Sequence, residues 1–546
     1  MTDLKCSSCD AIVSFSKEEL SLFEKLEIPI PEECFLCRTR HRLAFWTFGK
    51  FRKGKSDLSG ESLITVLPEK PRFPIYTSKE WFSDDWEPPA TDYNPDKSFF
   101  DQLKELQEKT PHPHQFGRNN FNSDWCDDVW ESKNCYLCRS LLECENVGYG
   151  YRVVQIKDSF DLAYSYSSEK IYDAAYIFNS FRVKYAFNVR DSMDSIFLYD
   201  CRNVRNCFMC WNLRNKQYHI KNQPYSKEEY FEKIKDYDFG SLKTIKKLKI
   251  EWRWLLQNEA IHRENLNFRI KNSTGNFLSD CNNCINCFQL EGSENSANIV
   301  RGLRNKNCIE MSGGLDMELS GQVCQATSCF DAKFCLNITN CRYSMYLDQC
   351  NNCEYCFGCV CLRKKKFCIL NKQYTEEEYE KLKEEIIKSM KSRGEYGKFL
   401  PLPMAYTGYN LSLANIYFPK TKEEVRLFGG LWDNIEKSTE GISADQLPDN
   451  IKDVDEKITS QPLICSETGY RFNISERELV FLEEMNIPLP VYHPDYRTKN
   501  RFGPLTSLTP YSGTCAFCHK EIITNYPTDW GYKKIACEAC YNEKVI

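Results

Sequence analysis

A cysteine-rich stretch that occurs twice, 149 residues apart, constrains the fold of this chain more than any other feature. The matched pairs are Cys135-Tyr-Leu-Cys138 with Cys284-Ile-Asn-Cys287, Glu145 with Glu294, Cys207 with Cys356, and Cys210 with Cys359. The stretches that follow also match, Asn222–Tyr230 with Asn371–Tyr379, with no gap. Self-similarity at a fixed offset is typical of a tandem repeat, so we interpret this region as a duplication.

Within the first copy, similar side chains also recur at a step of about eleven residues, as in short-period solenoids. The three columns are Phe160, Ile171, Arg182, Met193 and Val204; Ala163, Ala174, Tyr185, Ile196 and Cys207; and Tyr166, Ile177, Asn188, Tyr199 and Cys210. The columns are mostly apolar, and Asp, Asn and Ser lie between them. This pattern predicts stacked coils of a β-solenoid, in which inward residues bury one another.

Two cysteine knuckles, Cys6-Ser-Ser-Cys9 and Cys34-Phe-Leu-Cys37, stand at the N-terminal end. Four thiolates from two tight turns can surround one tetrahedral Zn²⁺. Because all four ligands would come from the protein, the spacing predicts a structural zinc with no position for a substrate. Two ordinary turns with free cysteines are the alternative.

Residues 464–540 repeat residues 5–80, but the metal positions diverge. Cys515-Ala-Phe-Cys518 and Cys537-Glu-Ala-Cys540 form a complete second site, whose N-terminal counterparts are Ser56, Ser59, Thr77 and Glu80. The counterparts of the N-terminal ligands are Cys465, Thr468, His493 and Tyr496. We therefore expect one zinc in each terminal module, about two per chain.

The central cysteines allow three interpretations. Cys350, Cys353, Cys356 and Cys359 lie where small apolar residues lie in other coils, so we expect buried thiols. An additional zinc site is one alternative. An iron–sulfur cluster is the other, because the run resembles that of bacterial ferredoxins; its last spacing is one residue short and no proline follows.

Composition and cysteine usage indicate the compartment. The chain has 72 basic and 77 acidic residues, which argues against a general nucleic-acid coat. Thirty cysteines and no apolar leader or membrane-length apolar run favour a reduced cytoplasmic protein. We expect a soluble chain that does not contact a membrane.

The predicted fold class is mostly β with short helices: a duplicated β-solenoid-like Cys/Asn-rich repeat flanked by two homologous zinc-ribbon modules. The predicted segments are an N-terminal zinc-ribbon module (1–90), a linker (91–125), solenoid copy 1 (126–235), a helical connector (236–278), solenoid copy 2 (279–390), an aromatic segment and acidic linker (391–460), and a C-terminal zinc-ribbon module (461–546).

The terminal cysteine pairs around the doubled repeat, together with Leu362–Tyr379, Phe399–Asn410 and Leu447–Ile451, resemble uncharacterised Cys-rich zinc-ribbon proteins of candidate-phyla bacteria. The resemblance covers nearly the whole chain. It implies zinc ligands at Cys6, Cys9, Cys34, Cys37, Cys515, Cys518, Cys537 and Cys540, and it implies nothing about a substrate. The departures are at Ser56, Ser59, Thr77, Glu80, Thr468 and Tyr496.

No signature of catalysis is present: a P-loop, a dinucleotide-binding glycine pattern and a nucleophile elbow are missing from the sequence. His112-Pro-His114 is read as a surface loop, and Cys465 with His493 is the one candidate for an incomplete, open metal site. We therefore expect a non-enzymatic zinc scaffold that binds a protein partner.

Two other functions remain open. RNA or ribosome binding would use the matching basic residues Arg38, Arg40, Arg42, Arg497, Lys499 and Arg501. A thiol or iron–sulfur redox protein is the third hypothesis. The sequence predicts no oligomeric state.

Overall fold

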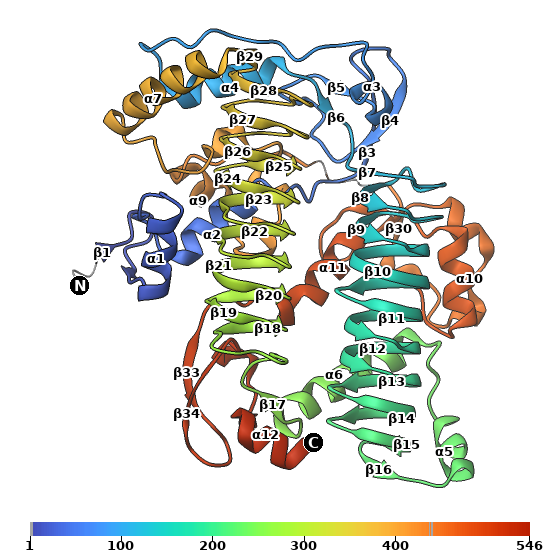
Figure 1. Ribbon diagram of the computed structural model, residues 1–546. Helices are drawn as coiled ribbons and strands as arrows, with labels where there is room; N and C mark the ends of the chain where they lie inside the picture. The colour runs from blue at the N-terminus through green and yellow to red at the C-terminus, as the bar shows by residue number, and fades with distance from the viewer. Residues whose placement is uncertain (1–3, 436, 438–439) are drawn as a thin grey trace. The chain divides into compact units, whose positions relative to one another are not determined.

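The computed structural model describes residues 4–435, 437 and 440–546 (Figure 1). Of the expected segment 391–460, residues 436, 438 and 439 lie outside the described residues. The fold is mostly strand, with β-solenoid coils of about 21 turns in total. The chain forms two compact units, each from two separate stretches: Met1–Gln115 with Asn265–Asp433, and Phe116–Glu264 with Asn434–Ile546. Each terminal module therefore joins the solenoid that is farther from it in sequence.

The first solenoid contains ten strands, which pair in chain order. They are β7 (Gly117–Arg118), β8 (Cys126–Trp130), β9 (Cys138–Leu142), β10 (Glu145–Ala163), β11 (Tyr166–Phe178), β12 (Phe181–Arg190), β13 (Met193–Tyr199), β14 (Arg202–Trp211), β15 (Arg214–Ile220) and β16 (Gln223–Pro224). All pairs are parallel except the terminal β15–β16 hairpin.

The second solenoid contains twelve strands and is drawn in green and yellow in Figure 1. They are β18 (Gly275–Ser279), β19 (Asn282–Ile285), β20 (Cys287–Glu291), β21 (Glu294–Leu303), β22 (Ile309–Leu315), β23 (Gly321–Thr327), β24 (Phe330–Lys333), β25 (Leu336–Thr339), β26 (Arg342–Met345), β27 (Glu354–Phe357), β28 (Lys366–Ile369) and β29 (Lys372–Gln373). It also ends in an antiparallel hairpin, β28–β29.

The solenoid coil has twelve residues, so the expected period of eleven is wrong. Ile171 pairs with Val183 in the first solenoid, and Ile299 pairs with Met311 in the second. A step of eleven is present at the start of the second solenoid, where Phe268 bridges to Ser279. The inward columns therefore run through residues twelve apart, such as Ser159, Ile171 and Val183, and the three columns expected from the sequence do not exist.

Corners set the length of the coil. Nearly every third residue of a solenoid has a positive φ, as at Asn134 (56°), Leu137 (51°), Ser140 (58°) and Glu143 (53°). Except in the end coils, the residue after a corner points inward and is generally buried, for example Cys138 at 0% exposure. Four corners and four three-residue sides make one twelve-residue coil. The left-handed conformation is unfavourable for most L-residues, so each corner needs compensation.

Many inward serines and cysteines provide this compensation, because their side chains bond two backbone groups at a corner. Ser132 Oγ accepts a hydrogen bond from the Cys144 N–H, one coil later, at 3.0 Å, and donates to the Trp130 carbonyl at 2.8 Å. Cys138 Sγ accepts from the Gly150 N–H at 3.2 Å and donates to the Tyr136 carbonyl at 3.3 Å. A small side chain with both a donor and an acceptor satisfies polar groups that would otherwise be buried without partners.

Asparagines at the corners form ladders along the outside. Asn122 donates to Asn134, Asn134 to Asn146, and Asn146 to Asp158, over distances of 2.9, 2.9 and 2.7 Å. Each bond joins successive coils. Asn and Asp tolerate the left-handed conformation better than other non-glycine residues, which accounts for their abundance in the repeat.

The rest of the first unit covers the second solenoid. Its elements are β1 (Leu4–Lys5), β2 (Ile12–Val13), α1 (Lys17–Lys25), α2 (Phe35–Leu43), β3 (Arg52–Lys55), β4 (Ser62–Thr65), β5 (Ile75–Tyr76), α3 (Ser78–Trp81), α4 (Phe99–Lys109), β6 (His112–Pro113), α7 (Glu376–Ser392), α8 (Ala414–Tyr417) and α9 (Lys422–Leu427), with short 3-10 turns at Leu402–Met404 and Tyr409–Leu411. The largest cluster of buried apolar side chains in this unit joins α1, α4 and α7 to the solenoid.

The rest of the second unit covers the first solenoid in a similar way. Its elements are α5 (Lys227–Ile234), α6 (Leu242–Asn258), β17 (His262–Arg263), β30 (Ile442–Ser443), β31 (Leu463–Ile464), β32 (Arg471–Phe472), α10 (Glu476–Glu484), α11 (Pro494–Phe502), β33 (Tyr511–Thr514), β34 (Glu521–Thr524), β35 (Ile535–Ala536) and α12 (Glu538–Val545), with 3-10 turns at Ala444–Gln446, Ile451–Asp453, Glu456–Ser460, Gly503–Leu505 and Thr528–Trp530. Among the described helices, none has the length and apolar character needed to cross a membrane.

The role of the inward thiols can be tested at Cys138. We expect Cys138→Ser to be tolerated, since a hydroxyl keeps both hydrogen bonds, and Cys138→Ala to cost about 1–3 kcal/mol because the Gly150 N–H loses its acceptor. Urea unfolding and amide hydrogen exchange at Gly150 measure the difference. An equal cost for serine and alanine would contradict the hydrogen-bonding role.

Candidate metal centres

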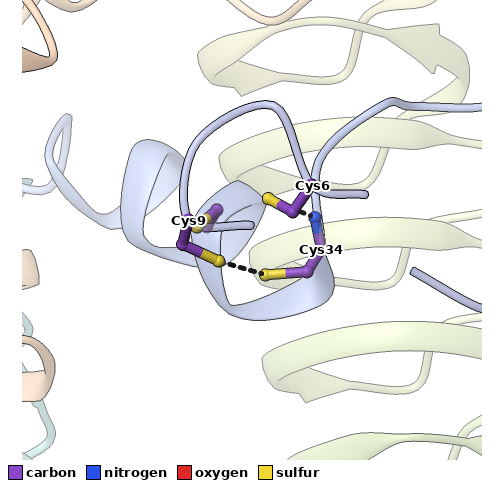
Figure 2. A group of neighbouring side chains, drawn as sticks. Cys6, Cys9 and Cys34 are labelled. Carbon is purple, nitrogen blue, oxygen red and sulfur yellow. Dashed lines mark hydrogen bonds between the residues drawn. The ribbon is translucent and has the colours of Figure 1, made fainter. Parts of the chain in front are cut away.

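The four N-terminal cysteines meet at one point. The ligand atoms of Cys6, Cys9, Cys34 and Cys37 all lie within 4.8 Å of one another, so this group could hold a metal ion. Figure 2 shows two of the contacts: Cys9 Sγ lies 3.6 Å from Cys34 Sγ, and the Cys34 N–H donates to Cys6 Sγ at 3.2 Å. The β1–β2 hairpin supplies one pair and the first turn of α2 supplies the other.

The C-terminal group is built on the same plan. The ligand atoms of Cys515, Cys518, Cys537 and Cys540 also lie within 4.8 Å of one another. Cys518 Sγ lies 3.7 Å from Cys537 Sγ, and the Cys537 N–H donates to Cys515 Sγ at 3.3 Å. The first pair stands in the β33–β34 hairpin, and the second begins α12. A hairpin and a helix N-terminus thus form both four-cysteine groups.

One thiol of the N-terminal group is poised to lose its proton. A hydrogen bond from the Cys37 thiol lowers the pKa of Cys34 to about 5. Cys34 is also the N-cap residue of α2, and the positive end of a helix favours a thiolate. Thiolates are the form in which cysteine binds a metal, so the donor set fits a tetrathiolate site.

In the N-terminal module, the Glu80 carboxylate binds the other residues that align with the four C-terminal cysteines. Glu80 Oε2 accepts hydrogen bonds from Ser56 Oγ at 2.6 Å and from the N–H and Oγ1 of Thr77, both at 2.8 Å. Burial opposes ionisation, but hydrogen bonds from Ser56, Ser59 and Thr77 lower the pKa of Glu80 to about 2. An ionised carboxylate therefore links the two turns where the C-terminal module has four cysteines.

The remaining candidate, Cys465 with His493, lacks a ligand set. Cys465 is buried, and His493 is the N-cap residue of α11, where its Nδ1 accepts a hydrogen bond from the Asp495 N–H at 3.1 Å. Within the described part of the chain, no third ligand joins these two within metal-binding distance. Thr468 and Tyr496 are the residues that align with the other two N-terminal cysteines, Cys9 and Cys37.

His112 and His114 do not form a surface loop pair. His112 is 1% exposed, stacks on Phe73 with ring centroids 3.9 Å apart, and lies with Nε2 3.5 Å from Asp348 Oδ2. His114 Nδ1 accepts a hydrogen bond from the Ser78 N–H at 3.0 Å. The expectation of a surface loop is wrong for His112, which is part of the packed core of the first unit.

The central cysteines of the second solenoid point into its interior. Cys350, Cys353, Cys356 and Cys359 are each 0% exposed, and each Sγ donates to the carbonyl two residues before it. Among the described residues, the ligand atoms of these four cysteines do not all lie within 4.8 Å of one another, as those of the terminal groups do. Burial raises the pKa of Cys350, whereas hydrogen bonds from the neighbouring thiols of Cys341, Cys350 and Cys356 lower the pKa of Cys353.

A buried ion cluster fixes the N-terminal module to the second solenoid. Arg38 and Arg42, one turn apart on α2, contact the Glu310 carboxylate at 2.6 and 2.9 Å. Glu310 also accepts from Asn298 Nδ2, which donates to Glu19 of α1 as well. Burial opposes ionisation of Glu310, but the two guanidinium groups lower its pKa.

A matching cluster fixes the C-terminal module to the first solenoid. Arg497 and Arg501 of α11 both pair with Asp161, the latter at 2.7 Å. Tyr149 donates to Glu478 of α10 at 2.5 Å, and burial raises the pKa of Glu478 to about 7. Tyr149 and Asp161 stand 149 residues before Asn298 and Glu310, so the two modules use corresponding corners of the two solenoids.

These clusters occupy most of the basic residues that RNA binding would use. Arg38, Arg42, Arg497 and Arg501 are at most 8% exposed, and their charges face carboxylates. The Arg40 guanidinium lies over the Phe428 ring, 4.5 Å from its centroid, and Lys499 is exposed. Sequence reasoning missed the clusters because the acidic partners lie hundreds of residues away.

No protein-family model matches this chain, and no curated protein matches it. The geometry of the sites therefore carries the functional argument.

The two ion clusters can be tested with a matched pair of variants, each of which should loosen only one module. We expect Glu310→Gln to weaken docking of the N-terminal module by about 3–5 kcal/mol, because two guanidinium groups would remain buried without a full counter-charge. Hydrogen exchange and limited proteolysis should then rise in residues 5–80 and stay unchanged in residues 464–540. Asp161→Asn is the matched variant and should give the reverse pattern. Equal exposure of both modules in either variant would contradict this assignment.

Proposed function

We propose that the protein is a non-enzymatic scaffold held together by two structural zinc ions. The supporting observation is the pair of four-cysteine groups, in which all four donor atoms come from the protein. Four thiolates at these separations suit Zn²⁺, and a tetrahedral site with four protein ligands leaves no position for a substrate. All thirty cysteines are free thiols in the structure, which suits a reducing compartment such as the cytoplasm.

We place the partner surface on the outer face of the second solenoid. A surface hollow of about 380 Å³ is lined by Asp316, Glu318, Ser328, Cys329, Phe330, Arg342 and Tyr343. Tyr343 is 43% exposed and begins an aromatic stack with Tyr355 and Phe367, whose ring centroids are 4.9 and 5.2 Å apart in turn. Tyrosine, phenylalanine and arginine are enriched in protein interfaces, so this face suits a protein partner.

Elemental analysis tests the metal content. We expect about two zinc ions and negligible iron per chain, because each four-cysteine group would hold one ion. Cys34→Ser and Cys537→Ser should each remove about one zinc. Cys353→Ser is the control and should keep both. Stoichiometric iron, or loss of metal from Cys353→Ser, would contradict the proposal.

In-cell crosslinking followed by mass spectrometry tests the partner surface. We expect the wild-type chain to recover a reproducible protein partner, and Arg342→Glu with Tyr343→Ala to reduce its recovery at least tenfold, as loss of interface hot spots does. Met193→Ala, at the corresponding position of the first solenoid, is the matched control and should keep the partner. Failure of the wild-type chain to enrich any partner, with its zinc intact, would refute the scaffold function.

A further inference from the structure

Helix α6 exposes a stripe of cations and large apolar side chains. The opposite side of this 17-residue helix is buried through Ile245, Leu248, Trp252 and Leu255 against the first solenoid. The exposed stripe consists of Lys243, Lys246, Lys247, Ile250, Arg253 and Trp254. Ile250 is 73% exposed and Trp254 is 55% exposed, one turn apart. Large apolar side chains exposed together among cations are unusual on a helix whose other face is already packed.

The fold does not require this stripe, as helix α4 shows. Leu248, Trp252 and Leu255 stand 149 residues after Phe99, Leu103 and Leu106, which form the buried face of α4 in the other unit. With the same alignment, Ile250 corresponds to Asp101, and Trp254 corresponds to Glu105. Both acidic residues are exposed. The two helices therefore pack alike, but α4 presents carboxylates to solvent where α6 presents Ile250 and Trp254.

The nearby acidic groups only partly balance the charge of the stripe. Asp449 accepts a hydrogen bond from the Lys243 N–H at 2.9 Å. Glu251, on the flank of the helix, pairs with Lys221, and Lys249, also on the flank, pairs with Asp173. Four cations line the stripe itself, although the chain as a whole carries a net charge of −5. This local excess of positive charge points to an anionic ligand.

We propose that this face of α6 binds single-stranded nucleic acid, a function beyond the scaffold role. Lys243, Lys246, Lys247 and Arg253 would contact phosphates, and the exposed Trp254 indole would stack on a base. Cations interleaved with an aromatic ring are the arrangement that binds single strands without sequence preference. An anionic bilayer is the less suitable ligand, because two apolar side chains supply little area for insertion.

Fluorescence anisotropy with labelled uridine and thymidine oligonucleotides of about 20 nucleotides tests the proposal on the full-length, zinc-loaded chain. We expect the logarithm of the binding constant to fall with the logarithm of salt concentration with a slope near −3, as four phosphate contacts require. Lys247→Ala and Arg253→Ala should each reduce the magnitude of the slope by about 0.7, because each removes one phosphate contact. Trp254→Ala should weaken binding at least fivefold through the lost stacking.

The second helix supplies the controls. Lys104→Ala removes the cation of α4 that corresponds to Arg253 and should leave binding unchanged. The double variant Ile250→Asp and Trp254→Glu gives α6 the residues of α4 and should abolish binding while circular dichroism stays the same. The double variant Arg342→Glu and Tyr343→Ala alters the proposed protein-partner surface and should keep oligonucleotide binding. Failure of the scaffold function can therefore be distinguished from failure of nucleic-acid binding. Oligonucleotide binding that is unchanged in the α6 variants would overturn the proposal. Binding to anionic vesicles or polyglutamate that depends on α6, without binding to oligonucleotides, would also overturn it.

Discussion

Hydrogen bonding at the solenoid corners is the interaction on which the rest of the structure depends. A left-handed residue at every third position gives a narrow, four-sided coil, and its backbone groups at the corners face the interior. Serine and cysteine are small enough for that interior and carry both a donor and an acceptor, as Ser132 and Cys138 do. The cysteines of the repeat thus form hydrogen bonds with buried backbone groups, whereas the terminal four-cysteine groups bring together donor atoms for a metal.

The same corners also decide where the terminal modules attach. Asp161 and Glu310 are corner residues of the two solenoids, and each receives two arginines from one helix. A buried carboxylate between two guanidinium groups tolerates little displacement, because loss of either partner leaves an uncompensated charge. The attached module therefore keeps its position whether it has four cysteines, as around Cys34, or the reduced set around Cys465.

The solenoid class and the four-cysteine sites could be predicted because they depend on local spacing. The period could not, since inward positions accept Ser, Cys, Val, Ile and Gly alike, and corners accept Leu137 and Tyr149 as well as Asn. Runs of one residue type along a column, such as Asn122, Asn134 and Asn146, are therefore short. The ion clusters could not be predicted either. From the sequence, Arg42 is expected to be a solvated helical residue, because its partner Glu310 is 268 positions away.

The order of segments has consequences for folding. The first unit needs residues on both sides of the first solenoid, and the second needs the last hundred or so residues of the chain. Each solenoid can form from local coil-to-coil contacts, but attachment of its module closes a loop of hundreds of residues. Because non-local contacts form late and slowly, the Arg–carboxylate clusters should be the last parts of each unit to assemble. Metal binding needs only neighbouring turns, so each four-cysteine module can be preformed before it docks.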